Sequence, residues 1–229
     1  MTEISGSTRL VGILGWPVER SLSPRMHNAA FAALGLDWAY VASPTPPDRL
    51  EEAVRGLVAL GFVGANVTTP HKLSITSYCD TDVPSVNTLV VRAGGVEGLS
   101  TDTAILGGLS FGRPVVLGDG GTATAFVAAL PDARQYSRRG TWPPDVADAD
   151  LVINATSERD AVVVELHAGQ MLVDLPYPET ATACAARSAG ARVVTGLEVL
   201  LAQGAAAFEL WTGIAAPVDV MRDAIGLDT

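Results

Sequence analysis

The chain has one lysine, Lys72, among 15 basic side chains, and all the others are arginines. An ammonium group can shift its pKa and donate or accept a proton, whereas a guanidinium stays charged. Lys72 ends the run Asn66-Val67-Thr68-Thr69-Pro70-His71-Lys72, so amide, hydroxyl and ammonium groups directly follow an apolar stretch. Ligands of α/β sheets bind at such carboxyl ends of strands. We therefore interpret Lys72 as a proton-transfer residue; the alternative is a codon bias that left one lysine by chance.

Two further polar segments, Asn87-Thr88 and Ser100-Thr101-Asp102, also follow apolar stretches. An aspartate beside a lysine can hold the ammonium in position and stabilise its charge, and such a pair can move a proton. Helix capping is the alternative role, because aspartate and threonine are both good caps. No group of histidines, cysteines and carboxylates has the spacing of metal ligands, so we expect no metal site.

A glycine-rich loop, Gly118-Asp119-Gly120-Gly121-Thr122-Ala123, lies between an apolar run and an apolar helix. Glycines at this place allow a tight turn and let a pyrophosphate approach the helix N-terminus. The spacing departs from the full G-x-G-x-x-G pattern, so a plain tight turn is the alternative.

Ser137-Arg138-Arg139 follows this loop by about twenty residues, where dinucleotide-binding folds place the residue that reads the adenosine ribose. An acid there favours NAD, whereas paired arginines suit a 2′-phosphate through charged, planar hydrogen bonding. We therefore predict NADP as the coenzyme; the alternative is two solvated surface arginines.

These segments are positioned by apolar runs that alternate with amphipathic stretches, which predicts parallel sheets covered by helices on both faces. The expected strands are 10–14, 38–42, 62–67, 89–92, 114–118, 134–136, 151–153, 171–174 and 192–194, with a hairpin turn at Gly94-Gly95. The expected helices start at Ser23-Pro24, after Lys72 and after Thr101, and cover 46–60, 196–211 and 218–225, with one more after the glycine loop.

Composition excludes several classes of protein. A net charge of −10 argues against a nucleic-acid partner, and 48% hydrophobic residues predict a substantial core. No apolar run reaches the ~18 residues that span a bilayer, and no signal peptide is evident at the start. Only two cysteines occur, far apart, so we expect a reducing cytoplasm, no disulfide framework and no membrane partner.

Several segments together carry a family resemblance. They are Ser21-Leu22-Ser23-Pro24, the run from Asn66 to Lys72, Val86-Asn87-Thr88, Thr101-Asp102, and Gln203-Gly204-Ala205 with Phe208-Glu209-Leu210-Trp211. In this order, and over nearly the whole chain, they resemble the shikimate dehydrogenase family. The run from 66 to 72 and the ending from 203 to 213 are specific, and the glycine loop and Asn154-Ala155-Thr156 support them.

The resemblance implies an α/β fold of two domains. Residues 1–100 would form the substrate-binding domain, with C-terminal helices 205–229 packing back on it, and residues 101–204 a Rossmann-like NADP-binding domain. The implied activity is reversible hydride transfer between NADPH and 3-dehydroshikimate, giving shikimate in aromatic amino-acid and chorismate biosynthesis. The implied assembly is a monomer or a homodimer.

The same resemblance implies roles for individual residues. Lys72 and Asp102 would be the catalytic pair. The substrate, a small cyclic hydroxy-acid, would contact Ser21, Ser23, Asn66, Thr68, Asn87, Asp102, Tyr177 and Gln203. The coenzyme would contact Gly118, Gly120, Gly121, Thr122, Ala123, Ser137, Arg138, Arg139, Asn154, Thr156 and Gly196.

The chain also departs from the family pattern. Asp119 places an acid in the phosphate loop where the family usually has alanine, the cofactor domain is short, and no Gly-Met follows Asn154-Ala155-Thr156. A carboxylate there should repel a pyrophosphate, so Asp119→Ala is expected to tighten NADP binding. Two alternatives remain: a dehydrogenase of quinate or an amino-substituted shikimate, and a shikimate-binding protein that has lost productive coenzyme binding.

Replacing Lys72 tests its role as the proton-transfer residue. Lys72→Ala should lower kcat by roughly 10²–10⁴-fold, the usual contribution of a positioned acid–base group. Lys72→Arg should restore little, because the charge survives but the proton transfer does not. Near-normal kcat in either variant would contradict the assignment.

Overall fold

The computed structural model describes residues 4–227, which divide into two compact units. The first unit comprises the chain as far as Thr101 and again from Leu201, and the second comprises Asp102–Leu200. Thr101 and residues 201–204, predicted to lie in the second domain, therefore fall in the first. The reason is Asn87, whose side chain is hydrogen-bonded both to Thr101 and to Gln203.

The first unit contains a five-stranded sheet in the order β2-β1-β3-β4-β5. Its strands are β1 (Arg9–Gly15), β2 (Trp38–Pro44), β3 (Gly64–Val67), β4 (Thr88–Arg92) and β5 (Gly95–Leu99). Strand β1 pairs in parallel with β2 and β3, whereas β3–β4 and β4–β5 are antiparallel. The sheet is thus mixed rather than wholly parallel, because the predicted hairpin reverses the chain direction between its last two strands.

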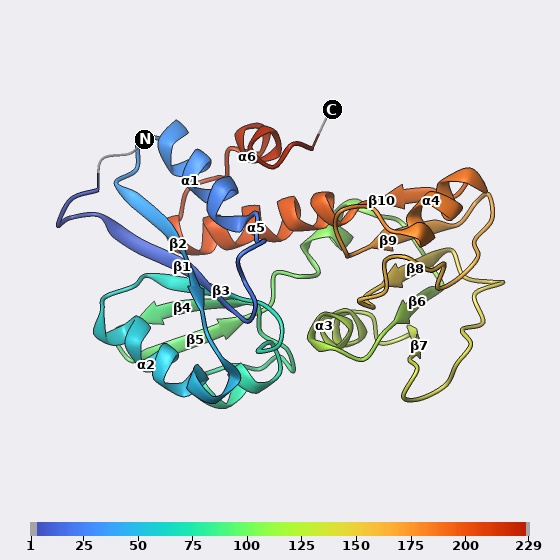
Figure 1. Cartoon of the computed structure of the whole chain (residues 1–229), viewed down its shortest axis with the longest axis horizontal. Helices are drawn as coiled ribbons and strands as arrows, with labels where there is room; N and C mark the ends of the chain where they lie inside the picture. The colour runs from blue at the N-terminus through green and yellow to red at the C-terminus, as the bar shows by residue number, and fades with distance from the viewer. Residues whose placement is uncertain (1–3, 228–229) are drawn as a thin grey trace. The chain divides into compact units, whose positions relative to one another are not determined.

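Helices cover both faces of this sheet. Figure 1 shows α1 (Ser23–Ala33), α5 (Gly196–Thr212) and α6 (Val218–Ile225) on one side, and α2 (Leu50–Ala59) on the other. The helix predicted over 46–60 starts later, since its first residues form the 3₁₀ turn η1 (Pro47–Arg49). The helices expected after Lys72 and Thr101 are likewise only short 3₁₀ segments, η2 (Ser74–Tyr78) and η3 (Ala104–Gly108).

The second unit contains a parallel sheet in the order β10-β9-β8-β6-β7. Its strands are β6 (Pro114–Leu117), β7 (Arg134–Tyr136), β8 (Leu151–Asn154), β9 (Met171–Asp174) and β10 (Arg192–Val194). Helix α3 (Gly121–Ala129) packs on one face and α4 (Ala181–Ser188) on the other. The sequence analysis missed α4 because the side chains that it buries are small: Thr182, Ala183 and Ala186.

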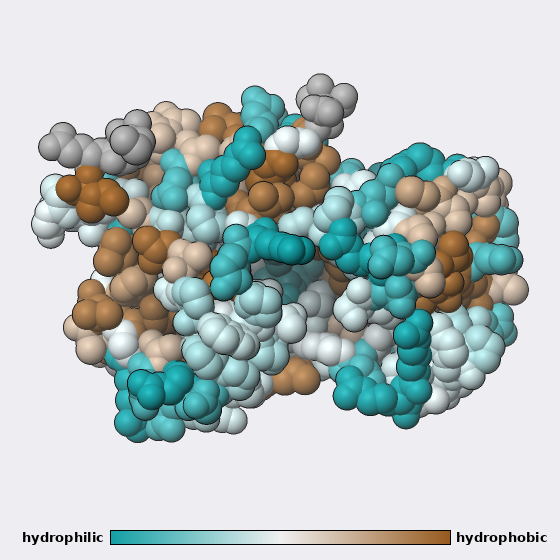
Figure 2. Space-filling model, viewed as in Figure 1, coloured by the Kyte–Doolittle hydropathy of each residue, from teal (hydrophilic) through white to brown (hydrophobic). Residues whose placement is uncertain are grey.

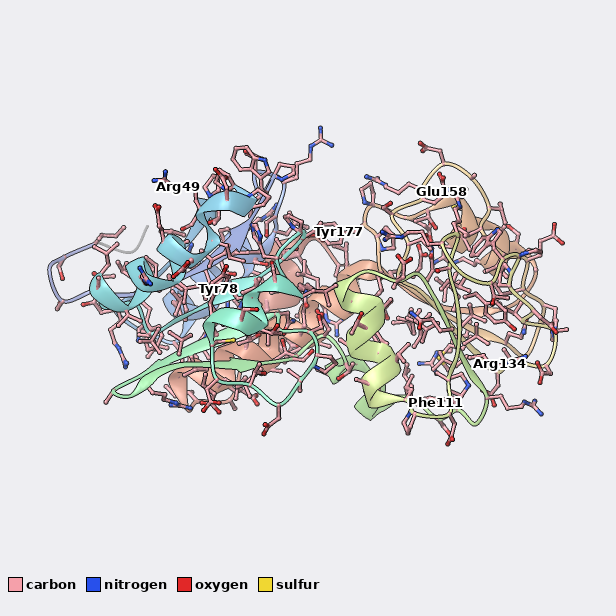
Figure 3. All side chains as sticks on the ribbon, turned by 90° about the horizontal axis from the view of Figure 1, so that it is seen from below. Arg49, Tyr78, Phe111, Arg134, Glu158 and Tyr177 are labelled. Atoms are coloured by element: carbon pink, nitrogen blue, oxygen red, sulfur yellow. The ribbon has the colours of Figure 1, made fainter. Side chains whose placement is uncertain are left out.

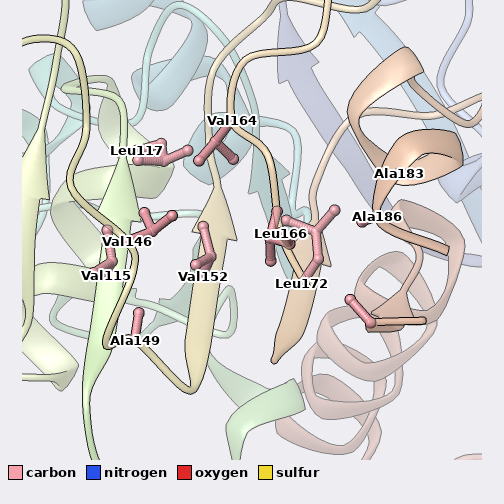
Figure 4. Packing of buried hydrophobic residues seen from close by; sticks show 11 residues of the cluster. Val115, Leu117, Val146, Ala149, Val152, Val164, Leu166, Leu172, Ala183 and Ala186 are labelled. Carbon is pink, nitrogen blue, oxygen red and sulfur yellow. The ribbon is translucent and has the colours of Figure 1, made fainter. Parts of the chain in front are cut away.

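Loops supply much of the core on the α4 face. Val146, Ala149, Val164 and Leu166 lie outside any helix or strand, yet they pack with strand residues such as Val152 (Figure 4). The buried amide of Gln170 donates hydrogen bonds to the carbonyl oxygens of Val146 and Ala149, at 2.7 and 2.8 Å. One side chain therefore satisfies backbone groups that a helix would otherwise satisfy internally.

The surface mixes hydrophilic and hydrophobic residues (Figure 2). Some large apolar side chains are well exposed, Leu60 most of all at 73%. Within residues 4–227 no helix has the length and apolarity to cross a membrane, and no three histidine, cysteine or acidic side chains are grouped to hold a metal ion.

An aromatic cluster encloses His27 in the core of the first unit. Its ring stacks on that of Tyr40 at 4.6 Å between centroids and lies against Phe31, Phe208 and Trp211. Neither ring nitrogen has a hydrogen-bond partner among the described residues. Complete burial lowers the pKa of His27 from 6.5 to about 3, because the charged ring would lose its hydration.

This burial predicts an acid-sensitive fold. Between pH 6.5 and 3 the unfolded chain binds a proton at His27 that the folded chain does not, so stability falls as the pH falls through this range. At pH 5 the loss is about 2 kcal/mol relative to pH 7. His27→Phe keeps a ring in the cluster and removes this loss, which urea unfolding at both pH values measures. His167→Phe, at an exposed histidine, is the matched control; equal pH dependence in His27→Phe and the unaltered chain contradicts the prediction.

Candidate active site

In the first unit, Asn66 on β3 lies opposite Thr88 on β4. Its amide nitrogen donates hydrogen bonds to the Asn87 carbonyl at 3.2 Å and to Thr88 Oγ1 at 3.1 Å. Its amide oxygen accepts a hydrogen bond from the Tyr40 hydroxyl at 2.8 Å. The orientation of the Asn66 amide is therefore fixed from both ends.

Asn87, which precedes β4, is buried and joins three segments of the chain. Its Oδ1 accepts the backbone N–H of Thr101 at 2.7 Å, and its Nδ2 donates to Thr101 Oγ1 at 3.0 Å and to Gln203 Oε1 at 3.1 Å. The structure thus brings together Asn66, Asn87 and Gln203, three of the predicted substrate residues. Asp102, the predicted partner of Lys72, directly follows Thr101.

The predicted catalytic lysine is anchored through its backbone. The Lys72 carbonyl accepts the N–H of Val86 at 2.9 Å, which places Lys72 beside the segment that leads to Asn87. The neighbouring His71 is buried, and its Nε2–H donates to the carbonyl of Thr45 at 2.7 Å. His71 therefore shapes the turn that precedes Lys72.

The remaining substrate residues of this unit lie at strand ends and a helix start. Ser21 Oγ accepts the backbone N–H of Ser23 at 3.3 Å, where α1 begins. Thr68, which follows β3, donates its backbone N–H to the Leu14 carbonyl at the end of β1. Hydroxyl groups therefore occur at the carboxyl ends of β1 and β3, where α/β sheets bind ligands.

In the second unit the glycine loop fits a coenzyme diphosphate. Gly118 has φ of +118°, and a Cβ there would lie 2.9 Å from the Ala155 carbonyl oxygen, so only glycine allows this close approach. Gly120 caps α3 without a side chain, and nothing lies within 4 Å of the Cβ position that it leaves empty. The start of α3 is thus capped by no side chain and has open space beside Gly120, an arrangement that suits a phosphate.

The segment after β7 is tied to this loop. Gln135 Nε2 donates to the Gly118 carbonyl at 2.9 Å, and Arg139 forms a two-pronged ion pair with Asp119 at 2.7 and 2.8 Å. The Arg139 guanidinium, with the Ser137 hydroxyl as a smaller contributor, holds the pKa of Asp119 below its usual value. The Asp119 carboxylate, which would repel a phosphate if it were unpaired, is therefore paired with a cation.

The segment after β8 is held by Asn154, whose amide is directed into the protein. It donates to Asp174 at 2.7 Å and accepts the Thr156 hydroxyl at 2.7 Å. Burial raises the pKa of Asp174, against the hydrogen bonds from Thr180 and Asn154 that lower it. Asn154 thus organises this loop, and any contact with coenzyme falls to Thr156 and the loop backbone.

Close packing at the start of α5 requires a glycine at position 196. A Cβ there would lie 2.6 Å from the Pro176 carbonyl oxygen, so only glycine lets α5 start so close to the segment that carries Tyr177. Gly196 and all the other predicted coenzyme residues lie in the second unit. Of the predicted substrate residues, Asp102 and Tyr177 lie in this unit.

Comparison with known proteins identifies the family of this chain. Residues 13–89 match the family model of the shikimate dehydrogenase substrate-binding domain, and residues 196–225 that of the shikimate 5′-dehydrogenase C-terminal domain. A shikimate dehydrogenase (NADP(+)) from Anaeromyxobacter sp. (strain Fw109-5) is 39% identical, and the alignment covers 97% of both chains. The chain belongs to the shikimate dehydrogenase family.

Solved structures of shikimate dehydrogenases share the fold. The enzyme from Aquifex aeolicus matches 98% of this chain and 100% of its own, with a TM-score of 0.90 at 29% identity. That from Thermus thermophilus, solved in complex with NADP(H) and shikimate, matches 94% and 98%, with a TM-score of 0.84 at 30% identity.

Tyr40 is a residue of this site that sequence reasoning did not find. It lies in a half-buried strand, where an aromatic residue is ordinarily read as core, and its ring does pack on His27. Its hydroxyl nevertheless reaches Asn66, a contact that only the arrangement of the strands reveals.

Removing the Tyr40 hydroxyl should loosen Asn66 without disturbing the core. Tyr40→Phe should weaken shikimate binding by about two- to tenfold, the contribution of one hydrogen bond, while the ring keeps its packing on His27. Calorimetric titration measures the affinity, and Tyr78→Phe, at an exposed tyrosine, is the control. Unaltered affinity in Tyr40→Phe contradicts a positioning role.

Proposed function

We propose that this chain is an NADP-dependent shikimate dehydrogenase, which interconverts 3-dehydroshikimate and shikimate in aromatic amino-acid biosynthesis. The observation that carries the proposal is the amide cluster of Asn66, Asn87 and Gln203 at the end of the first sheet, of which Asn87 is buried and the other two are half-buried. Three amides there suit a ligand rich in hydroxyl groups, since each can both donate and accept hydrogen bonds. The relatives named above support the same activity.

Within the first unit, the chain supplies substrate positioning and a proton. Ser21 and Ser23 bind the substrate carboxylate through their hydroxyl groups. Thr68 and the three amides orient the ring hydroxyls. Lys72 donates a proton to the oxygen of the ring ketone as it becomes an alkoxide, and Asp102 stabilises the ammonium charge.

Within the second unit, the glycine loop and the N-terminus of α3 bind the coenzyme diphosphate. Bound NADPH supplies the hydride. The acid in this loop motivated the alternative of a protein without productive coenzyme binding, and its pairing with Arg139 removes that objection. Thr122, Ser137, Arg138 and Thr156 are further polar side chains proposed to contact the coenzyme.

The proposed setting is the cytoplasm, which suits the two free cysteines, Cys79 and Cys184. The enzyme works as a monomer or a homodimer on small molecules, without nucleic acid or membrane.

Absorbance at 340 nm tests this function. The purified chain should reduce NADP+ with shikimate, and kcat/KM should be higher than with quinate or with NAD+. Lys72→Ala, prepared in parallel, is the negative control for a contaminating dehydrogenase. A preference for quinate would support the alternative substrate, and shikimate binding without any reduction would show a protein that only binds.

A further inference from the structure

The Asp119–Arg139 pair ties the segment after β7 to the glycine loop. Arg139 Nε donates to Asp119 Oδ2 at 2.8 Å and Nη2 to Oδ1 at 2.7 Å, so the guanidinium meets the carboxylate side-on. Asp119 stands inside the phosphate loop, between Gly118 and Gly120, and is about one-third exposed. A side-on pair of this kind fixes both partners more firmly than a single contact.

Arg138 has a different environment from its neighbour. Its guanidinium lies 5.9 Å from the centre of the Trp142 ring and 3.6 Å from Glu158 Oε2, too far for a hydrogen bond. The other oxygen of Glu158 accepts three backbone N–H groups, those of residues 159–161. Glu158 is therefore fixed by its own loop, and its ion pair with Arg138 is longer than the side-on pair of Arg139, which lets the Arg138 guanidinium turn toward another anion.

These contacts indicate different roles for the two arginines, although the sequence suggests the 2′-phosphate for both. A bare carboxylate in the loop would repel the diphosphate, which NADP and NAD share. An arginine bound side-on to that carboxylate cancels its charge at the loop. The group that distinguishes NADP from NAD, the 2′-phosphate, is then left to the arginine that is not so engaged.

We infer that Arg139 does not share the 2′-phosphate with Arg138, as the sequence suggests for the pair, but serves the glycine loop, where it neutralises Asp119 so that the diphosphate of either coenzyme can bind. The inference rests on the proposed function, because it assumes that the second unit binds a nicotinamide dinucleotide. It makes Arg139 a positioning and shielding residue.

Calorimetric titration of NADP+ and NAD+ at low salt tests this division. Arg139→Ala should weaken both coenzymes by the same factor, about three- to tenfold for a partly screened charge. Asp119→Ala should tighten both by a similar factor, and the double variant should bind both as the unaltered chain does. Arg138→Ala should weaken NADP+ alone, by about 10- to 100-fold, as for hydrogen bonds to a charged group.

Arg134→Ala is the matched control, because Arg134 likewise pairs with an aspartate, Asp148, at 2.5 Å, and lies on β7, just before the segment that carries Arg139. Figure 3 shows it on the other side of the second unit from Glu158, so both affinities should stay unchanged. An NADP-selective loss in Arg139→Ala would overturn the inference, as would weaker binding of both coenzymes in Asp119→Ala. If neither coenzyme binds the unaltered chain, the proposed function fails, and the inference with it.

Discussion

The first unit depends on the side-chain amide of Asn87. This buried amide bonds to the segment that leaves the unit at Thr101 and to the helix that returns at Gln203. A buried amide that loses a partner costs about 1–3 kcal/mol, so the three segments hold each other in place. The same cluster contains the residues proposed to hold the substrate. Substrate positioning and the path of the chain therefore share one set of hydrogen bonds, and a change to either affects both.

The sheets could be predicted from the sequence because their strands are short apolar runs with clear ends. The strands at 134–136, 171–174 and 192–194 lie where they were expected. The helices were harder. Prolines delay the start of α2, and α4 buries only small side chains, so its pattern carries little signal. The antiparallel half of the first sheet follows from the hairpin, which local sequence does indicate.

The site could be predicted as far as residue types, but not as far as their pairing. A lone lysine after a strand and glycines before a helix are local patterns with a physical reason behind each. Hydrogen bonds such as Tyr40 to Asn66 depend on how the strands pack, and no spacing in the sequence encodes them. Asp119 is the clearest example. Its position in the glycine loop suggests that it repels a phosphate, but Arg139, twenty residues later, pairs with it and neutralises its charge.

The loop-built face of the second unit has a consequence for how such domains change in length. The alignment with the Anaeromyxobacter relative has 271 positions, more than the 229 residues of this chain, so the relative carries residues that are missing here. A parallel sheet that loses covering residues must still shield its apolar face and satisfy the nearby carbonyls. Apolar loop residues do the first, and the Gln170 amide does the second. A shorter chain can therefore keep such a face covered where a single polar side chain, here Gln170, satisfies carbonyl groups that a turn of helix would satisfy internally.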